Sequence, residues 1–192
     1  IILVSSDVPS RGSDPNHMKT RILFGDGAGC LLVNNEPKGE SGVVAHDFGT
    51  DGRHWDVATI LGGGTTYPVP NKKIGDNIWF RMDGKRIYKI AIDKISSSID
   101  KVLKDSKMNI EDIHLIVPHQ ANYRIIQSLL KKLGGNREKM YLTIEKYGNT
   151  ATASMAITLA EAIKEKGISK GDYLLLISFG AGFNWGVMLI KC

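Results

Sequence analysis

Two stretches, Val117-Pro118-His119-Gln120-Ala121-Asn122 and Tyr147-Gly148-Asn149-Thr150-Ala151-Thr152-Ala153-Ser154, indicate the fold of this chain. The first follows the apolar run 113–117, which predicts a strand interrupted by His114, and it precedes a helical pattern that begins near Ala121. The second precedes an alanine-rich segment that predicts a tightly packed helix. A histidine and a carboxamide placed where a strand stops and a helix begins can direct two hydrogen-bond donors at one oxygen atom. Such an arrangement can hold an enolate.

Strand-like and helix-like segments alternate along the rest of the chain, which predicts an α/β fold. The expected strands are 1–5, 21–33, 43–48, 113–117 and a final pair, and a helix is expected over 83–103 with Ser96 to Ser98 on its solvent side. The stretch 49–75 is rich in glycine and has few helix signals, so we expect it to cover a site or an interface. Asn149 is expected to N-cap a helix that starts at Thr150 and ends at Gly167.

Composition is that of an ordinary soluble globular domain, with 192 residues, 42% of them hydrophobic and 23% charged. The longest apolar run, 173–177, is too short for a membrane helix, and no signal peptide is visible. The two cysteines predict no disulfide scaffold, which indicates a reducing, cytoplasmic location. Cys30 leads into a strand with no helix N-terminus beside it, so we expect a buried structural thiol and not a nucleophile.

Other kinds of site are weakly supported. His114 and His119 are five residues apart, which places them on opposite faces of a strand, and no third ligand follows, so no metal site is predicted. Gly62-Gly63-Gly64-Thr65 lacks the Gly-Lys-Ser/Thr ending of a phosphate loop and is better interpreted as a turn. The basic residues lack interleaved aromatics, which argues against nucleic acid as a partner.

With these two stretches, the glycine-rich segments Phe24-Gly25-Asp26-Gly27-Ala28-Gly29 and Phe179-Gly180-Ala181-Gly182-Phe183-Asn184-Trp185-Gly186 make the chain resemble the β-ketoacyl-acyl-carrier-protein synthase III family of the thiolase-like superfamily. The resemblance implies a mixed sheet covered by helices, in a fold built from two related halves. The two glycine-rich segments are interpreted as the closing hairpins of those halves. Residues 1–36 would then close the N-terminal half, and residues 37–192 would form the C-terminal half.

The resemblance implies a decarboxylative Claisen condensation between an acyl thioester and malonyl-acyl-carrier protein, in fatty acid biosynthesis. His119 and Asn149 match the family's catalytic histidine and asparagine. Phe179 resembles the aromatic residue beside the nucleophile, and the backbone N–H of Ala181 matches a position that completes an oxyanion hole, where the family more often has glycine. On the residues alone, His119 could also be a core histidine at a strand end and Asn149 a plain N-cap.

A basic stripe, Arg124, Lys131 and Lys132, begins one turn after His119. By pattern alone it could be a solvated helix face. The resemblance implies that an acidic acyl-carrier protein docks there, on the basic residues with Lys89 and on the contact segment Gln120, Ala121, Asn122, Tyr123 and Arg124. The family often has an arginine after the Asp-Pro of the first long loop to contact coenzyme A. Here Asp14-Pro15-Asn16-His17 leads to Met18 and Lys19, so an acyl-carrier primer is an alternative to an acyl-coenzyme A primer.

Family members carry their nucleophilic cysteine in the first half of the protein, and this sequence resembles the portion after it. We therefore expect a dimeric acyltransferase whose cysteine lies outside this chain, with the chain inactive alone. Coenzyme A or phosphopantetheine thioesters would be substrates, and no permanently bound cofactor is expected. Two alternatives stay open: an inert carrier-protein or subunit-binding module, and a related condensing enzyme of secondary metabolism.

Overall fold

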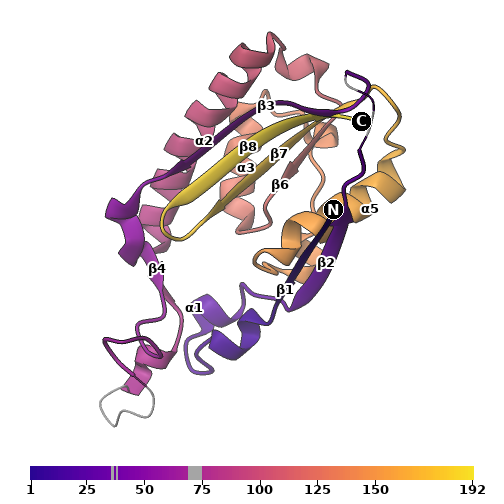
Figure 1. Cartoon of the computed structure of the whole chain (residues 1–192). Coiled ribbons are helices and arrows are strands. Elements are labelled where there is room, and N and C mark those ends of the chain that lie inside the picture. Colours follow the sequence, from indigo (N-terminus) through magenta and orange to yellow (C-terminus); the bar gives the residue numbers. More distant parts are fainter. Residues whose placement is uncertain (36, 38, 69–74) are drawn as a thin grey trace.

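The computed structural model describes residues 1–35, 37, 39–68 and 75–192 (Figure 1). Its strands are β1 (Ile2–Asp7), β2 (Gly27–Leu32), β3 (Gly42–Thr50), β4 (Ala58–Thr59), β5 (Arg81–Met82), β6 (Leu115–Pro118), β7 (Tyr173–Gly180) and β8 (Asn184–Lys191). Its α-helices are α1 (Met18–Arg21), α2 (Gly84–Ser106), α3 (Tyr123–Lys132), α4 (Ile144–Tyr147) and α5 (Ala153–Lys166). Short 3-10 helices cover Pro9–Gly12, Gly52–Val57, Gly75–Ile78, Ile110–Asp112 and Arg137–Lys139.

The strands form one four-stranded sheet and two smaller ones. The four-stranded sheet has the order β3-β8-β7-β6, with β6 parallel to β7 and the other neighbours antiparallel. β1 pairs only with β2, antiparallel, and β4 pairs with β5. The expected α/β class with a mixed sheet is therefore confirmed.

Helices α2 and α3 cover one face of the four-stranded sheet, as Figure 1 shows. Ile95, Ile99 and Val102 recur at helical spacing on α2 and are buried against Ile116 and Leu175 of the sheet. The expected helix at 83–103 is confirmed.

The expected solvent side of α2 is wrong at two of its three serines, because α2 lies along the sheet and buries more than the apolar stripe. Ser96 and Ser98 are buried, while Ser97 is exposed. The Ser98 hydroxyl donates to Asp47 Oδ2 of β3 over 2.7 Å. That bond satisfies a polar group in the helix–sheet interface.

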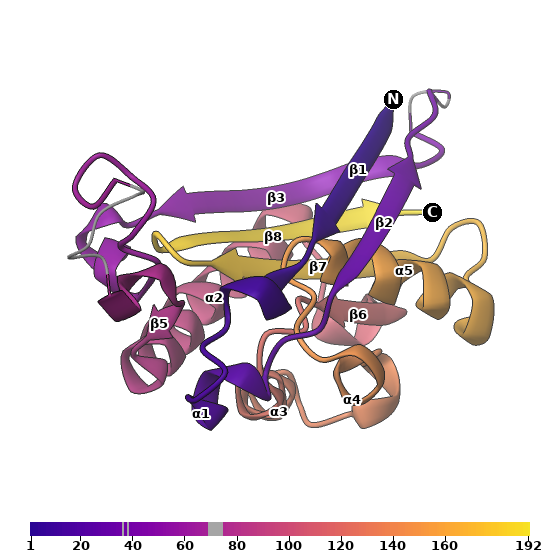
Figure 2. The same cartoon turned by 90° about the horizontal axis from the view of Figure 1, so that it is seen from below.

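Helix α5 packs between the other face of this sheet and the β1–β2 pair, and Figures 1 and 2 show β1 and β2 beside it. Leu115 and Leu174 of the large sheet meet Leu159 and Ala162 of α5. On the opposite side, a Cβ built on Gly29 of β2 would lie 2.7 Å from the Cβ of Ala156. Small residues are therefore needed on both elements, which confirms the expected tight packing of this helix.

The N-terminal segment departs from the expected strand over 21–33. Arg21 ends α1, and only residues from Gly27 onward form β2. Asp14 Oδ1 accepts the Asn16 N–H over 2.8 Å and turns the chain into α1, where the hydroxyl of Thr20 donates to the His17 carbonyl. The predicted hairpin around Phe24 is wrong, because residues 22–23 form a turn and no strand, and β2 pairs with β1 along Gly27–Leu32.

The expected burial of Cys30 is also wrong. Residues of β2 alternate between a partly buried side that faces α5 and an exposed side, and Cys30 falls on the exposed side. Ile2 and Val4 of β1 are exposed as well. No described residue covers this face of the strand pair.

The glycine-rich stretch 49–75 contains more structure than expected. Asp51 caps a 3-10 helix at Gly52–Val57 by accepting the Arg53 N–H, and Ala58–Thr59 form β4. Residues 69–74 of the stretch lie outside the described residues, as do residues 36 and 38 at the expected boundary. The division into 1–36 and 37–192 stays a prediction.

Candidate active site

The candidate site lies where the parallel strands β6 and β7 end. Pro118 closes β6, and the N–H of the next residue, His119, donates to the Ile177 carbonyl of β7 over 2.6 Å. Phe179 lies two residues further along β7. Ligands of open α/β sheets bind beyond the carboxyl ends of the strands, and His119 is placed at such an end.

His119 is held by a hydroxyl on one side and an aromatic ring on another. Its Nδ1 lies 2.5 Å from the Ser154 Oγ of α5, and its ring meets Phe179 edge to face at 5.5 Å between centroids. Burial lowers the pKa of His119 to about 4. The imidazole is therefore neutral at pH 7, with one nitrogen as donor and the other as acceptor.

Asn149 is fixed by its backbone. Its N–H donates to the Leu23 carbonyl over 2.8 Å, and its own carbonyl accepts the Gly25 N–H over 3.1 Å. The side-chain Oδ1 accepts the Ala151 N–H over 2.9 Å. The amide nitrogen is then the end of the side chain that carries donors, which suits an oxygen ligand.

The expected N-cap role of Asn149 is wrong, because α5 begins at Ala153 and not at Thr150. Thr152 is the N-cap, and its N–H donates to Asp7 Oδ2 of β1 over 3.0 Å. Ala151, in the left-handed region with φ of 48°, separates Asn149 from the helix. Asn149 therefore belongs to a turn that precedes the helix.

Gly25 is a site residue that sequence reasoning interpreted only as part of a hairpin. A Cβ at this position would lie 1.8 Å from the Tyr147 carbonyl oxygen. Glycine lets the backbone at Leu23–Gly25 approach the turn that carries Asn149. The signal in the sequence was the Phe-Gly-Asp-Gly pattern, but the partner of Gly25, Tyr147, lies 122 residues away and could not be identified from it.

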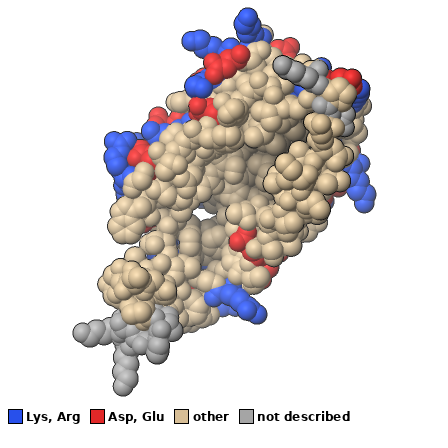
Figure 3. All heavy atoms as spheres, viewed as in Figure 1, with Lys and Arg blue, Asp and Glu red and all other residues tan. Residues whose placement is uncertain are grey.

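A cleft of about 1420 Å³ brings the four expected catalytic and supporting residues together: His119, Asn149, Phe179 and Ala181 all line it. Figure 3 shows a face of the molecule that is hollowed in its middle, with mostly uncharged residues around the hollow. Apolar side chains, Leu23, Phe24 and Phe80 among them, form much of the lining. A histidine and a carboxamide in a largely apolar cleft form a suitable receptor for a developing oxyanion.

The residues expected to contact a carrier protein fall into two groups: some line the cleft and others do not. Ala121, Asn122, Arg124 and Lys131 line the cleft, and Asn122 also caps α3 by accepting the Arg124 N–H. Lys19 lines the cleft too, together with two residues that were not expected at the site, His17 and Lys85. His17 directly precedes α1 and Lys85 lies on α2, so only the tertiary fold brings them near α3.

Gln120 departs from the expectation of a surface contact. Its side chain is fully buried. Nε2 donates to the Pro118 carbonyl over 2.7 Å, and Oε1 accepts the N–H groups of Thr143 and Ile144 at 3.0 Å each. Because its whole carboxamide is used inside the protein, Gln120 is a structural residue.

Three further expected contact residues, Tyr123, Lys89 and Lys132, are exposed but do not line the cleft. Lys132 Nζ lies 3.2 Å from Asp100 of α2. This ion pair offsets part of the positive charge that the sequence assigned to the stripe.

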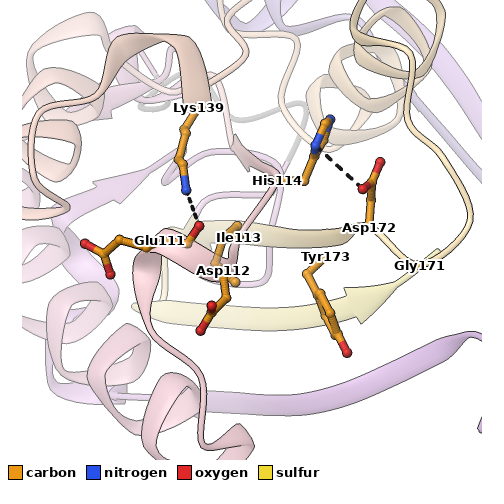
Figure 4. Close-up of a pocket in the computed structure, with 8 residues that line it drawn as sticks. All are labelled: Glu111, Asp112, Ile113, His114, Lys139, Gly171, Asp172 and Tyr173. Atoms are coloured by element: carbon orange, nitrogen blue, oxygen red, sulfur yellow. Dashed lines mark hydrogen bonds and ion pairs between the residues drawn. The ribbon is translucent and has the colours of Figure 1, made fainter.

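A smaller cavity of about 360 Å³ lies at the opposite end of β6, and Figure 4 shows its lining. His114 Nδ1 lies 3.7 Å from Asp172 Oδ1, and Lys139 donates to the Glu111 carbonyl over 2.6 Å. The two histidines once considered as metal ligands therefore belong to different cavities. Among the described residues, no group of three or more His, Cys, Asp or Glu is placed to hold a metal ion.

Neither cysteine lines the large cleft: Cys30 lies on the outer side of β2, and Cys192 follows β8 at the other end of the sheet. In the described part of the chain, the candidate site thus has no thiol beside it. No helix in that part is long and apolar enough to cross a membrane.

Two sheets packed on either side of α5, with a polar site at the carboxyl ends of β6 and β7, place the chain in the thiolase-like fold class. A family model for the 3-oxoacyl-[acyl-carrier-protein] synthase III C terminal matches residues 103–192, and a model for 3-oxoacyl-[acyl-carrier-protein] synthase III matches residues 1–52. The chain therefore belongs to the 3-oxoacyl-[acyl-carrier-protein] synthase III family.

Individual relatives agree. The β-ketoacyl-[acyl-carrier-protein] synthase III of Clostridium tetani is 40% identical over all of this chain and 59% of its own length. The crystal structure of the Thermus thermophilus synthase III matches with a TM-score of 0.88 and 31% identity, over all of this chain and 58% of that one. The priming β-ketosynthase of the R1128 polyketide pathway matches with a TM-score of 0.85 and 26% identity, over all of this chain and 56% of that one. The chain spans less than two thirds of the length of these relatives.

Proposed function

We propose that this chain supplies the enolate-stabilising site of a condensing enzyme that joins an acyl thioester to a malonyl thioester carried on acyl-carrier protein. The observation that carries the proposal is the convergence of His119 and Asn149 on one cleft, each with one polar atom occupied inside the protein and another left for a ligand. The family relationship and the names of the relatives support the same reaction.

In the proposed reaction, the bond between the malonyl carboxylate carbon and the α carbon breaks and carbon dioxide leaves. The electron pair moves into an enolate, and negative charge develops on the thioester oxygen. N–H donors from His119 and Asn149 would stabilise that charge without rearrangement, because both residues are already fixed. The α carbon then forms a bond to an acyl carbonyl carbon, and the thiolate that carried the acyl group leaves.

We further propose that the acyl group is carried on a cysteine other than Cys30 and Cys192, because neither of these lines the cleft. Four cationic residues line the same cleft and would attract an acidic carrier protein or a thioester phosphate: Lys19, Lys85, Arg124 and Lys131. Charge steering of this kind predicts an association rate that falls as salt concentration rises.

The proposal is tested with the polypeptide expressed from its own gene, by following carbon dioxide release from malonyl-acyl-carrier protein and carbon–carbon bond formation with an acyl primer. The expected result is both activities, and both lost when His119 is replaced by alanine. Release of carbon dioxide at an unchanged rate by His119→Ala contradicts the assignment.

Two other candidates have support of their own. The absence of both cysteines from the cleft favours an inert carrier-protein or subunit-binding module, which would bind the carrier protein without turnover in the same assay. The match to a priming β-ketosynthase of a polyketide pathway favours a condensing enzyme of secondary metabolism. Product analysis with a panel of acyl primers separates that candidate from fatty acid synthesis.

A further inference from the structure

Ser154, the second residue of α5, contacts the candidate catalytic histidine, and nothing in its sequence context singled it out. Its side chain is 1% exposed. Its Oγ lies 2.5 Å from His119 Nδ1 and accepts the backbone N–H of Gln120 at 3.4 Å. The hydroxyl is thus held between the histidine and the residue that follows it.

The direction of the short hydrogen bond follows from the contacts of that hydroxyl. The Ser154 oxygen already accepts a hydrogen bond from the Gln120 N–H, and a serine hydroxyl has a single proton with which to donate one. Among the described residues, His119 Nδ1 is its only side-chain acceptor. A buried O–H without an acceptor is costly, so the proton of Ser154 points at Nδ1.

We propose that Ser154 is a positioning residue that holds His119 in the tautomer with its proton on Nε2, so that the ring donates into the cleft. The burial that keeps the ring neutral makes this choice necessary, because a neutral imidazole has one donor only. With the proton on Nδ1, the nitrogen facing the cleft would be an acceptor and would repel an enolate oxygen. The kinetic part of this inference rests on the proposed function, and the tautomer itself does not.

Nitrogen-15 NMR of the His119 ring tests the tautomer directly in the polypeptide expressed from its own gene. In the unmodified protein at pH 7, we expect the proton on Nε2 only. In Ser154→Ala, we expect loss of the hydrogen-bonded Nδ1 shift and a mixture of tautomers. A proton found on Nδ1 in the unmodified protein, or a ring spectrum that Ser154→Ala leaves unchanged, overturns the proposal.

A kinetic comparison adds a readout that a purely structural role would not give. We expect Ser154→Ala to lower kcat for malonyl decarboxylation on the order of ten-fold with little change in KM, and Ser154→Cys, which keeps a weak donor, to recover part of it. An unchanged kcat in active Ser154→Ala overturns the kinetic part. If the NMR result holds and the unmodified protein does not turn over malonyl thioesters, Ser154 still sets the tautomer and the proposed function is what fails.

Thr158→Val is the matched control. Thr158 lies one turn further along α5, is fully buried, and shares a 2.7 Å hydrogen bond with the Thr143 hydroxyl. The control therefore also removes a buried hydroxyl hydrogen bond from α5, without touching His119. We expect the free energy of unfolding of Thr158→Val to fall by about as much as that of Ser154→Ala. The His119 tautomer and kcat of Thr158→Val should stay those of the unmodified protein.

Discussion

The two ends of strand β6 carry one histidine each, in opposite surroundings. At the carboxyl end, His119 meets a hydroxyl and a phenylalanine ring, and burial lowers its pKa to about 4. At the amino end, His114 is more exposed and lies 3.7 Å from the carboxylate of Asp172. The same residue type is thus a neutral hydrogen-bonding group at one end and a partner for an acid at the other. Surroundings, and not residue identity, assign the chemistry.

The largest difference between the two ends is expected in catalysis. Replacing His119 by alanine should lower malonyl decarboxylation by ~10²- to 10³-fold, because one oxyanion donor is lost. Replacing His114 by alanine should change it by less than about twofold, since exposed sites away from a catalytic centre have small effects. The measurement is the rate of carbon dioxide release at saturating substrate in both variants. Equal losses of rate in His119→Ala and His114→Ala would contradict a special role for the histidine at the carboxyl end of β6.

The buried position of His119 should also make stability depend on pH. An unfolded chain has a histidine pKa near 6.5, whereas the folded value is about 4. The unfolded state therefore binds the proton first as pH falls, so the free energy of unfolding should fall between about pH 6.5 and pH 4, by about 1–3 kcal/mol. Above pH 6.5 this contribution to the pH dependence vanishes.

Urea unfolding of the unmodified protein and of His119→Gln across that pH range measures the effect. The variant lacks the titrating ring and should show a flatter curve, while Asn149→Ala should keep the slope. Parallel curves for the unmodified protein and His119→Gln would show that the ring does not titrate as its burial requires.

An effect on stability of similar size is expected at Gly25, whose backbone contacts the turn that carries Asn149. Gly25→Ala places a methyl group against the Tyr147 carbonyl and should destabilise the protein by about 1–3 kcal/mol. Gly52→Ala is the control, because a Cβ at Gly52 meets nothing within 4 Å. Thermal unfolding of both variants is the measurement, and equal midpoints would mean that the segment at Gly25 does not hold the catalytic turn.

The smallest effect concerns the charges at the rim of the cleft. Arg124→Glu should weaken acyl-carrier protein binding about ten-fold at low salt, and less at high salt. Lys132→Glu should have a smaller effect, because Lys132 pairs with Asp100 and does not line the cleft. Lys166→Glu, at the end of α5, is the charge-matched control. Titration calorimetry at two salt concentrations gives the affinities, and equal losses in all three variants would indicate a net-charge effect without a docking site.

Much of this arrangement could be predicted from the sequence, because local patterns carry it. The strand before His119, the helix after it and the closing strand pair follow from periodicity and glycine placement. The pairing of His119 with Asn149 was predicted from their places where a strand ends and a helix begins, and from the family resemblance, and the cleft brings both together.

What could not be predicted depends on contacts between distant segments. The role of Gly25 depends on the Tyr147 carbonyl, and the burial of Gln120 depends on Thr143 and Ile144. A glutamine beside the candidate catalytic histidine gives no local sign that its carboxamide is used inside the protein. The start of α5 was misplaced for a similar reason, since Asp7 from β1 binds its N-cap residue.

The proposed function depends on His119 and Asn149 donating to one oxygen atom. A crystal structure of the polypeptide expressed from its own gene, bound to a non-reactive malonyl thioester analogue, would show whether they do. We expect the thioester oxygen within about 3 Å of both His119 Nε2 and Asn149 Nδ2. An analogue bound in the cleft with its thioester oxygen away from either nitrogen would overturn the shared role of the two residues.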